Sequence, residues 1–368
     1  MTILVILLMV AALAFANGAN DNFKGVATLL GSGTTSYRGA LAWATVTTLA
    51  GSLTAVFLAG VLLKTFSGRG LVDAALVVDP AFVAAVASGS ALTILLATWI
   101  GMPVSTTHSL VGALVGVGWA AGSAINLAKL AADFFGPLLL SPVVAILATG
   151  LLYVAFQAIR RVSGVRAQSC FCIGSEVVET VPALGHALML ERAEQLTIRH
   201  GDTVTCQRHY EGRLLGIDAG RVVDWLHFLS AGIVSFARGL NDTPKIAALL
   251  LLVPLIGRFG STALVGGLIA IGGLLGARKV AVVMSQRITA MNHGQGFTAN
   301  LVTGLVVIGA SRFGMPVSTT HVSCGALFGI GVVNGRAEWG TIGKILLAWI
   351  TTLPAGAALG GAVYFVMA

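Results

Sequence analysis

The sequence predicts an all-α polytopic membrane protein made of two inverted repeats, and three observations lead to this fold class. The chain has 368 residues, of which 56% are hydrophobic and only 10% are Asp, Glu, Lys or Arg, whereas soluble domains carry about 25% charged residues. The apolar residues form long uninterrupted stretches, which favours helices over the alternating strands of a transmembrane barrel. The octapeptide Gly-Met-Pro-Val-Ser-Thr-Thr-His occurs twice, at residues 101–108 and 314–321. This composition excludes a soluble enzyme, a disordered protein and a disulfide scaffold.

Apolar segments follow one another along the chain, about ten in all, five on each side of a polar stretch. In each set the third and fourth segments are short and are separated by Pro103 or Pro316, so they form either two full spans or one re-entrant hairpin with a broken helix. Each half then crosses the membrane five or three times. Because either number is odd, the two halves have opposite orientations. The segments are expected at about residues 2–20, 39–63, 80–100, 108–123, 134–159, 226–254, 259–284, 297–313, 321–334 and 341–367.

A second motif is also repeated. Residues 18–24, Gly-Ala-Asn-Asp-Asn-Phe-Lys, recur as residues 239–245, Gly-Leu-Asn-Asp-Thr-Pro-Lys. Between the halves, residues 158–224 hold 8 Lys/Arg and 8 Asp/Glu. We therefore expect three parts, a transmembrane repeat, a linker domain and a second transmembrane repeat, at residues 1–159, 160–224 and 225–368.

Arginines flank the expected linker and predict its side of the membrane. Arg160, Arg161 and Arg166 lie at one edge, and Arg213 and Arg221 lie near the other. Cytoplasmic loops are enriched in Lys and Arg. We therefore expect the linker inside the cell and both termini outside, in the cytoplasmic (inner) membrane.

The repeated octapeptide suits an anion site. Pro103 and Pro316 cannot continue a helix, but proline fits the first turn of one. The hydroxyl groups after each proline then lie where free backbone N–H groups collect at the positive end of a helix. Two such half-helices facing each other would bind a tetrahedral oxyanion; the alternative is that these residues only cap or pack the helices. The candidate substrate-binding residues are Ser105, Thr106, Thr107, Ser318, Thr319 and Thr320.

The second motif places acids within apolar stretches, where a charge is costly and usually functional. The oxygens of Asn20-Asp21 and Asn241-Asp242 suit Na⁺, or the carboxylates can carry H⁺. Lys24 and Lys245 follow each acid by three residues, one helical turn away, so a structural charge pair is the alternative. Both roles can coexist.

His108 and His321 end the hydroxyl motifs. They are either neutral packing residues or members of a proton relay or phosphate site. The spans hold no set of nucleophile, base and orienting group, and no metal-binding His/Glu cluster, so we expect no enzyme. A channel or receptor is disfavoured because inverted repeats with broken helices are typical of alternating access.

The polar linker offers one weak metal candidate. Cys170 and Cys172 could combine with Cys206 and His209, but the spacing fits no standard zinc pattern. We expect reduced cysteines, no metal, and a small mixed module with short strands at residues 174–222. The net charge is +8, but the basic residues are scattered between apolar runs and form no basic face, which argues against nucleic acid as a partner.

These motifs resemble those of the PiT-type inorganic phosphate transporters, which carry two Gly-x-Asn-Asp and two Pro-Val-Ser-Thr-Thr-His motifs. The resemblance covers nearly everything outside residues 160–224, and the segment from Ile288 to Phe297 also looks like the family. It implies an often dimeric, inverted-repeat symporter that imports phosphate with H⁺ or Na⁺ and needs no other cofactor. Some relatives carry sulfate, so a sulfate or related oxyanion permease is the alternative.

The resemblance also implies roles for single residues. Phosphate would bind to the two Ser-Thr-Thr triplets together with Asn20 and Asn241. The coupling cation would involve Asp21, Asp242, Gln295, Asn300 and Thr48.

The sequence departs from the family pattern at four positions. The second Asn of each acid motif is replaced by Lys24 or Lys245, and two positions often occupied by Glu look like Thr48 and Asn300. The site region thus loses two negative charges and gains two positive ones. An ammonium beside each acid could occupy the place of Na⁺, so we hypothesise that Na⁺ dependence is weak or absent and that H⁺ is the coupling ion.

Overall fold

The computed structural model describes residues 2–180, 191–202, 215–253 and 256–368. The chain divides into two compact units. Unit 1 consists of Met1–Val154 and His227–Ala368, and unit 2 of Ala155–Leu226. The boundaries expected for the linker, residues 160–224, lie within unit 2.

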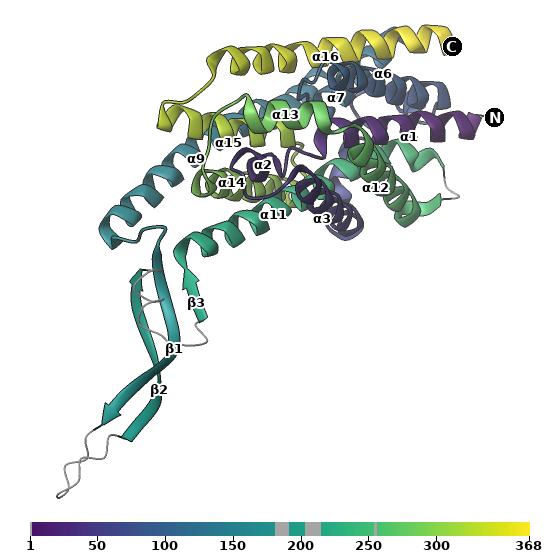
Figure 1. Cartoon of the computed structure of the whole chain (residues 1–368). Coiled ribbons are helices and arrows are strands. Elements are labelled where there is room, and N and C mark those ends of the chain that lie inside the picture. Colours follow the sequence, from purple (N-terminus) through teal and green to yellow (C-terminus); the bar gives the residue numbers. More distant parts are fainter. Residues whose placement is uncertain (1, 181–190, 203–214, 254–255) are drawn as a thin grey trace, which may run out of the picture. The chain divides into compact units, whose positions relative to one another are not determined.

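Unit 1 is helical, and its long helices follow the expected apolar segments (Figure 1). Among the described residues, six helical stretches are long and apolar enough to cross a membrane: Ile3–Asp21, Tyr37–Leu58, Pro80–Trp99, Leu127–Ser163, Gly257–Gly276 and Trp339–Met367. The predicted fold class is therefore confirmed. The main helices are α1 (Thr2–Asp21), α3 (Tyr37–Leu58), α6 (Pro80–Trp99), α7 (Thr106–Ala120), α9 (Gly136–Ser163), α11 (Ala219–Ala247), α12 (Gly257–Gly276), α14 (His293–Arg312), α15 (Thr319–Asn334) and α16 (Trp339–Met367).

Short helical pieces join the long helices. The second expected segment breaks after Leu58, and the seventh breaks at Ala277. The short elements are α2 (Ala27–Gly31), α4 (Gly60–Thr65), α5 (Ala74–Val77), α8 (Leu127–Lys129), the π-helix η1 (Leu130–Phe135), the 3-10 helix η2 (Ala248–Leu252) and α13 (Arg278–Gln286).

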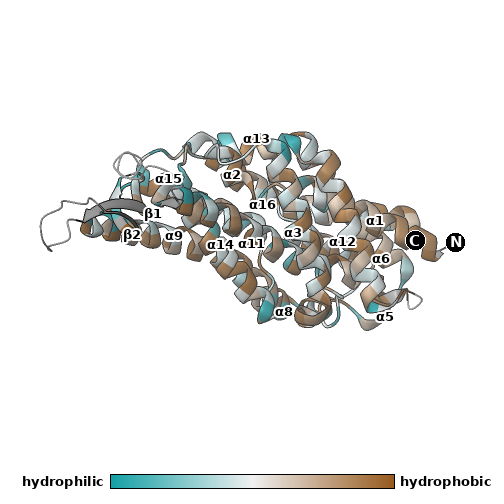
Figure 2. Cartoon of the chain, turned by 60° about the horizontal axis from the view of Figure 1, so that its bottom comes forward, coloured by the Kyte–Doolittle hydropathy of each residue, from teal (hydrophilic) through white to brown (hydrophobic). Residues whose placement is uncertain are grey.

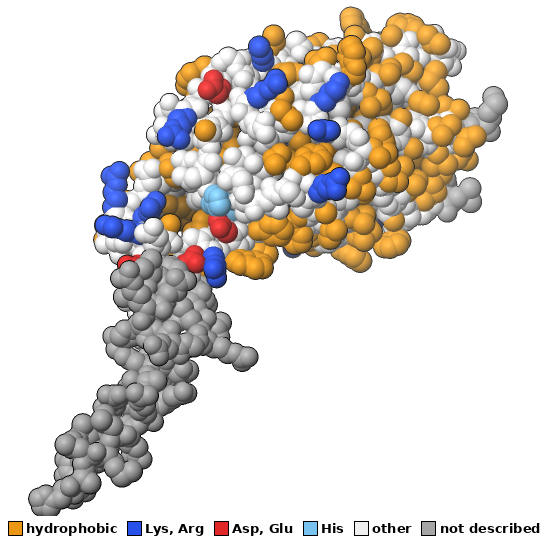
Figure 3. Space-filling model, viewed as in Figure 1, with side chains coloured by type: hydrophobic (Ala, Val, Ile, Leu, Met, Phe, Trp, Pro, Cys, Tyr) orange, Lys and Arg blue, Asp and Glu red, His pale blue; other side chains and the backbone are white. Residues whose placement is uncertain are grey.

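The outer surface of unit 1 is apolar, as expected for a face in contact with lipid. Phe57 is 79% exposed, and Leu151 and Ile350 are each 73% exposed. Figure 2 shows hydrophobic residues along the helices near both termini, and Figure 3 shows the same apolar covering on one face. On that face the Lys and Arg side chains gather on the half of unit 1 that lies away from the two termini.

The two repeated octapeptides form breaks between consecutive helices. After α6 and α14, Gly101 (φ +77°) and Gly314 (φ +71°) adopt the left-handed conformation that glycine tolerates best. Ser105 and Ser318 then cap the N-termini of α7 and α15. With 15 and 16 residues, these helices are only about 22–24 Å long, below the roughly 30 Å of a bilayer core. Each packs against the preceding helix, α7 on α6 and α15 on α14.

Glycines of the acid motifs let the two repeats interlock. A Cβ on Gly18 of α1 would lie 2.0 Å from the carbonyl oxygen of Ile269 in α12. A Cβ on Gly239 of α11 would lie 2.1 Å from the carbonyl oxygen of Thr48 in α3. Each acid motif therefore packs directly on the second long helix of the other repeat, an approach that only glycine permits.

Unit 2 contains an antiparallel sheet with the strand order β2-β1-β3. The pairing of β1 with β2 runs from Ser169↔Asp202 to Thr180↔Glu191. The expectation of short strands is wrong for β1 and β2, which have 12 residues each, because their pairing continues without interruption. The strands are β1 (Ser169–Thr180), β2 (Glu191–Asp202) and β3 (Leu215–Asp218).

Two of the cysteines considered for a metal lie on β1. The thiol of Cys170 is free, but Cys172 is disulfide-bonded. The expectation that both are reduced is therefore wrong for Cys172, whose sulfur is already in a covalent bond. Cys206 and His209 lie outside the described residues.

Candidate substrate site

The two Ser-Thr-Thr triplets lie buried at the N-termini of α7 and α15. The hydroxyl groups of Ser105 and Ser318 accept hydrogen bonds from the backbone N–H groups of His108 (3.1 Å) and His321 (3.2 Å). This is the usual N-cap arrangement, and it explains the first residue of each triplet structurally. The two threonines that follow each serine are also buried: Thr106, Thr107, Thr319 and Thr320.

The middle threonine of each triplet contacts the acid of its own repeat. Thr106 Oγ1 donates to Asp21 Oδ2 at 3.2 Å, and Thr319 Oγ1 donates to Asp242 Oδ2 at 3.4 Å. Asn17 Nδ2 also donates to Thr106 Oγ1 (2.9 Å) and to Asp21 Oδ2 (3.1 Å). The sequence motifs that lie about 80 residues apart thus form one hydrogen-bonded network in each repeat.

The last threonine of each triplet contacts a lysine of the opposite repeat. Lys24 Nζ donates to Thr320 Oγ1 at 2.6 Å, and Lys245 Nζ donates to Thr107 Oγ1 at 2.7 Å. The two contacts are equivalent because each threonine ends its triplet and each lysine ends its acid motif. The lysines therefore cross between the repeats and bring both triplets into a single site.

Each lysine also holds groups of the chain break near its threonine. Lys24 Nζ donates to the carbonyl oxygen of Val104 at 2.7 Å, and Lys245 Nζ donates to that of Val317 at 2.8 Å. These carbonyls lie just before the half-helices, where no helical N–H group is available for them. The lysines thus satisfy backbone acceptors as well as hydroxyls.

The lysines form ion pairs with the acids of their own repeat. Lys24 contacts Asp21, and Lys245 Nζ lies 3.3 Å from Asp242 Oδ1. All four side chains are at most 3% exposed. Removing one member of such a pair leaves an uncompensated buried charge, which costs about 3–5 kcal/mol. The expected charge pairs are therefore present and dehydrated.

The asparagines of the acid motifs bind the same chain breaks. Asn20 Oδ1 accepts from the backbone N–H of Val104 (3.1 Å), and Asn20 Nδ2 donates to the carbonyl oxygen of Met102 (3.0 Å). Asn241 Nδ2 donates to the carbonyl oxygen of Val317 at 3.1 Å. Both amides thus keep the broken segments in position beside the triplets.

A buried arginine, which the sequence analysis did not single out, joins this network. Arg238 is 1% exposed. Its Nη2 donates to Asn22 Oδ1 and to Thr48 Oγ1, each at 2.9 Å, and its Nη1 donates to Asn17 Oδ1 at 3.3 Å. Arg238 precedes Gly239 directly, as Asn17 precedes Gly18, so aligning the two motifs one residue further would have drawn attention to it.

The remaining candidates for cation coupling have other partners. Thr48 accepts from Arg238, as described. Asn300 Nδ2 donates to Thr28 Oγ1 at 2.8 Å. Gln295 forms a capping box with Asn292 at the start of α14 and donates from Nε2 to Tyr153 Oη at 2.8 Å. Among the described residues, no hydrogen bond joins Gln295 or Asn300 to Asp21 or Asp242.

The two histidines that follow the triplets face each other. The ring centroids of His108 and His321 are 4.4 Å apart, and Trp349 stacks on His321 at 3.8 Å. Both histidines are buried. This packing places them at the junction of the two half-helices.

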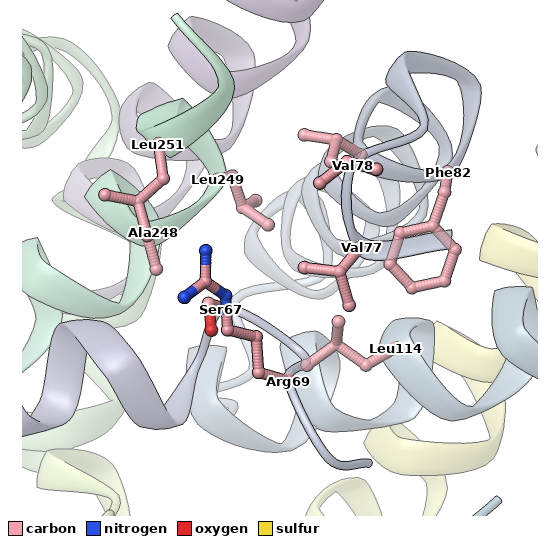
Figure 4. A pocket seen from close by; sticks show the side chains of 10 residues that line it. Ser67, Arg69, Val77, Val78, Phe82, Leu114, Ala248, Leu249 and Leu251 are labelled. Carbon is pink, nitrogen blue, oxygen red and sulfur yellow. The ribbon is translucent and has the colours of Figure 1, made fainter. Parts of the chain in front are cut away.

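A separate cavity lies beside η2, at the end of α11. Figure 4 shows Arg69 and Ser67 facing Ala248 and Leu249 of η2, with Leu114 and other apolar side chains around them. None of the candidate site residues lines this cavity. The triplets and their lysines are instead buried and hydrogen-bonded to one another.

Two helical repeats, each broken at its Pro-Val-Ser-Thr-Thr-His motif, and a buried site of hydroxyl, ammonium and carboxylate groups are typical of a secondary transporter for a small anion. The chain belongs to the phosphate transporter family, whose sequence profile matches residues 17–360. It is therefore an integral membrane protein that transports inorganic phosphate, not an enzyme.

Individual relatives agree with this family. A protein of Pyrococcus furiosus named "Putative phosphate permease" is 27% identical over 98% of this chain and 95% of its own length. The chloroplastic inorganic phosphate transporter 2-1 of Arabidopsis thaliana is 28% identical over 94% of this chain and 69% of its own length. A solved structure described as the sodium-dependent phosphate transporter has a TM-score of 0.76, with 23% identity over 99% of this chain and 98% of that one. That similarity confirms the fold.

Proposed function

We propose that this protein imports phosphate across the cytoplasmic (inner) membrane by alternating access and binds it between the two Ser-Thr-Thr triplets. The observation that carries the proposal is the crossed pair of contacts from Lys24 to Thr320 and from Lys245 to Thr107. Phosphate oxygens accept hydrogen bonds from ammonium groups, hydroxyls and helix N-terminal amides, and these donors converge here. The asparagines Asn20 and Asn241 support the same site by holding the chain breaks.

The two acids favour phosphate over sulfate in this proposal. Phosphate is partly protonated near neutral pH and can donate a hydrogen bond to Asp21 or Asp242. Sulfate has no proton to donate and would face the carboxylates as like charges. The lysines reduce this preference because they partly neutralise the acids. A sulfate or related oxyanion permease therefore stays the competing function that the experiment has to test.

We also propose that H⁺ rather than Na⁺ couples the transport. Lys24 and Lys245 already contact Oδ1 of Asp21 and of Asp242, an oxygen that would otherwise be available to a metal cation. At the position of Thr48, where relatives often carry Glu, the hydroxyl instead accepts from an arginine. A sodium ion would thus meet three fixed cations close to its expected ligands.

A lysine can carry the proton because, unlike an arginine, it can lose it within a protein. The charged or titratable groups that interact with the two lysines are the paired acids, Cys324 and the two histidines His108 and His321. We propose a Lys–Asp pair as the site of proton uptake and release, with the histidines as neutral neighbours.

For the topology, we propose that the linker is cytoplasmic and that both termini are outside. Arg160 and Arg161 in the last turn of α9 flank the linker, and Lys and Arg gather on the half of unit 1 opposite the termini (Figure 3). The resemblance to the family also leads us to propose a homodimer, which the mass of the detergent-solubilised protein would test.

Radiolabelled phosphate uptake into proteoliposomes tests the function, with Na⁺ and H⁺ gradients imposed separately and excess sulfate as competitor. We expect uptake driven by the H⁺ gradient and resistant to sulfate. Uptake that requires Na⁺ would keep phosphate transport but contradict the role given to the lysines. Uptake of labelled sulfate without any phosphate uptake would support the oxyanion alternative.

A further inference from the structure

One buried positive charge in the site has no carboxylate partner. Lys24 and Lys245 pair with Asp21 and Asp242, but the hydrogen-bond acceptors of Arg238 are the neutral side chains of Asn17, Asn22 and Thr48. Its Nε has no hydrogen-bond partner, and no salt bridge of the described residues involves Arg238. A buried guanidinium that meets only neutral acceptors is incompletely compensated.

This charge belongs to the substrate site. Arg238 donates to Asn17 at 3.3 Å, and the same Asn17 donates to Thr106 (2.9 Å) and to Asp21 (3.1 Å). One amide thus joins the guanidinium to a triplet hydroxyl and to an acid. Among the described buried residues, the charged Asp, Glu, Lys and Arg side chains are these three cations and two acids, which leaves one net positive charge.

From this balance we infer that the protein exchanges phosphate across the membrane faster than it takes phosphate up in net, so that outward transport of one anion accelerates inward transport of another. The inference rests on the proposed binding of phosphate at the triplets. When the site is empty, its excess charge has to be carried through the conformational change inside a medium of low polarity, which is costly. When one monovalent anion is bound, the charges balance and the change is easier.

The same balance selects the form of the substrate. Dihydrogen phosphate carries one negative charge and cancels the excess of one, whereas hydrogen phosphate would leave the site negative. The empty site can also become neutral if Lys24 or Lys245 releases a proton, because Arg238 cannot do so. Because this proton release is an additional step before the empty site can return, exchange is the fast mode and net uptake coupled to H⁺ is the slower one.

Wild-type proteoliposomes provide the first test. Labelled phosphate uptake is measured with unlabelled phosphate inside or without it, while ionophores remove the ion gradients and clamp the membrane potential. We expect internal phosphate to accelerate the initial uptake at least about tenfold. The free energy that corresponds to this change in rate is smaller than the cost of an uncompensated charge in the membrane. Equal rates with and without internal phosphate would overturn the exchange mode but leave phosphate transport intact. Absence of uptake in both would overturn the proposed function and this inference together.

A slow return of the empty transporter would make exchange faster than net uptake whatever its cause. Substitution of Arg238 therefore tests whether the charge of this residue is the cause. Arg238→Asn introduces the residue that stands at the equivalent position 17, and we expect it to bring the ratio of exchange to net uptake close to one. Arg238→Lys keeps the charge and should keep the ratio high. Arg312→Asn removes an exposed arginine at the end of α14 and serves as the matched control. A ratio that stays high in Arg238→Asn would overturn the role of this residue, and if that variant does not fold, the wild-type ratio still decides the exchange mode.

Discussion

Lys24 donates a hydrogen bond of 2.6 Å to Thr320, a residue 296 positions away in the sequence. Its counterpart, the bond from Lys245 to Thr107, spans 138 positions and measures 2.7 Å. Because both bonds cross from one repeat to the other, neither triplet is complete without the other half of the chain. The predictions below test this crossed arrangement and the packing that supports it.

Replacing both lysines by asparagine should make transport respond to Na⁺. In the double variant Lys24→Asn/Lys245→Asn, Oδ1 of Asp21 and of Asp242 loses its ammonium partner and becomes available to a metal cation. We expect phosphate uptake that rises with external Na⁺ at fixed pH, whereas wild-type uptake stays flat. Uptake by proteoliposomes over a series of Na⁺ concentrations, with choline as replacement ion, measures this. A Na⁺ response already present in the wild type would contradict the prediction.

Removing the crossed hydroxyls should weaken phosphate binding. Thr107→Val and Thr320→Val each remove one hydroxyl that we propose donates a hydrogen bond to the bound phosphate. A hydrogen bond to a charged group is worth about 1.5–3 kcal/mol, so the KM for phosphate should rise roughly 10- to 100-fold. The threonine shape is kept, so the folded structure should survive. Thr351→Val, at an exposed threonine of α16 that bonds only to backbone of its own helix, is the control and should leave the KM unchanged. An unchanged KM in both triplet variants would place the substrate elsewhere.

Adding a methyl group at the helix crossings should destabilise the protein. Gly18→Ala and Gly239→Ala would each place a Cβ about 2 Å from a backbone carbonyl oxygen, so α1 or α11 has to move away from its neighbour. We expect a loss of several degrees in Tm, or no folded protein, consistent with about 1–3 kcal/mol for overpacking. Gly267→Ala in α12, where nothing lies within 4 Å of the new Cβ, should have no such effect. Detergent-solubilised protein followed by thermal denaturation distinguishes the variants.

Gln295 should act on stability more than on ion coupling. Its side chain closes the capping box of α14 and reaches Tyr153, so Gln295→Ala should cost about 1 kcal/mol of stability. We expect a lower Tm and an unchanged dependence of uptake on Na⁺ and pH. Tyr153→Phe removes only the second contact and should have a smaller effect on the Tm. A changed ion dependence with normal stability would instead support the cation role implied by the family resemblance.

The helices and their order could be predicted because the apolar runs are long and because the repeats constrain their number. The two breaks were also predictable, since a proline followed by hydroxyl residues both ends a helix and begins the next. The local ion pairs were expected from a spacing of three residues.

The crossed contacts could not be predicted in the same way. A spacing of three links Lys24 to Asp21, but nothing in the sequence near Lys24 indicates Thr320. Arg238 was missed because the cost of a charge within an apolar stretch was applied to the acids only, although it holds equally for a cation. The hydrogen bond between Arg238 and Thr48 could not be predicted from either residue, because it requires the close approach of α3 and α11 that Gly239 permits.

Gly18 packs on α12, and Gly239 packs on α3. This packing between the two repeats has a consequence for biosynthesis. The ribosome completes α1 long before α12 exists, so in the nascent first half Gly18 lacks the helix on which it packs, although Asn20 and Asp21 already have partners in their own repeat. The second half supplies both the surface that α1 requires and the threonine that Lys24 contacts. Assembly of the site therefore has to follow translation of nearly the whole chain, and truncated or stalled products would leave Lys24 without Thr320 and expose the face of α1 that α12 covers in the complete protein.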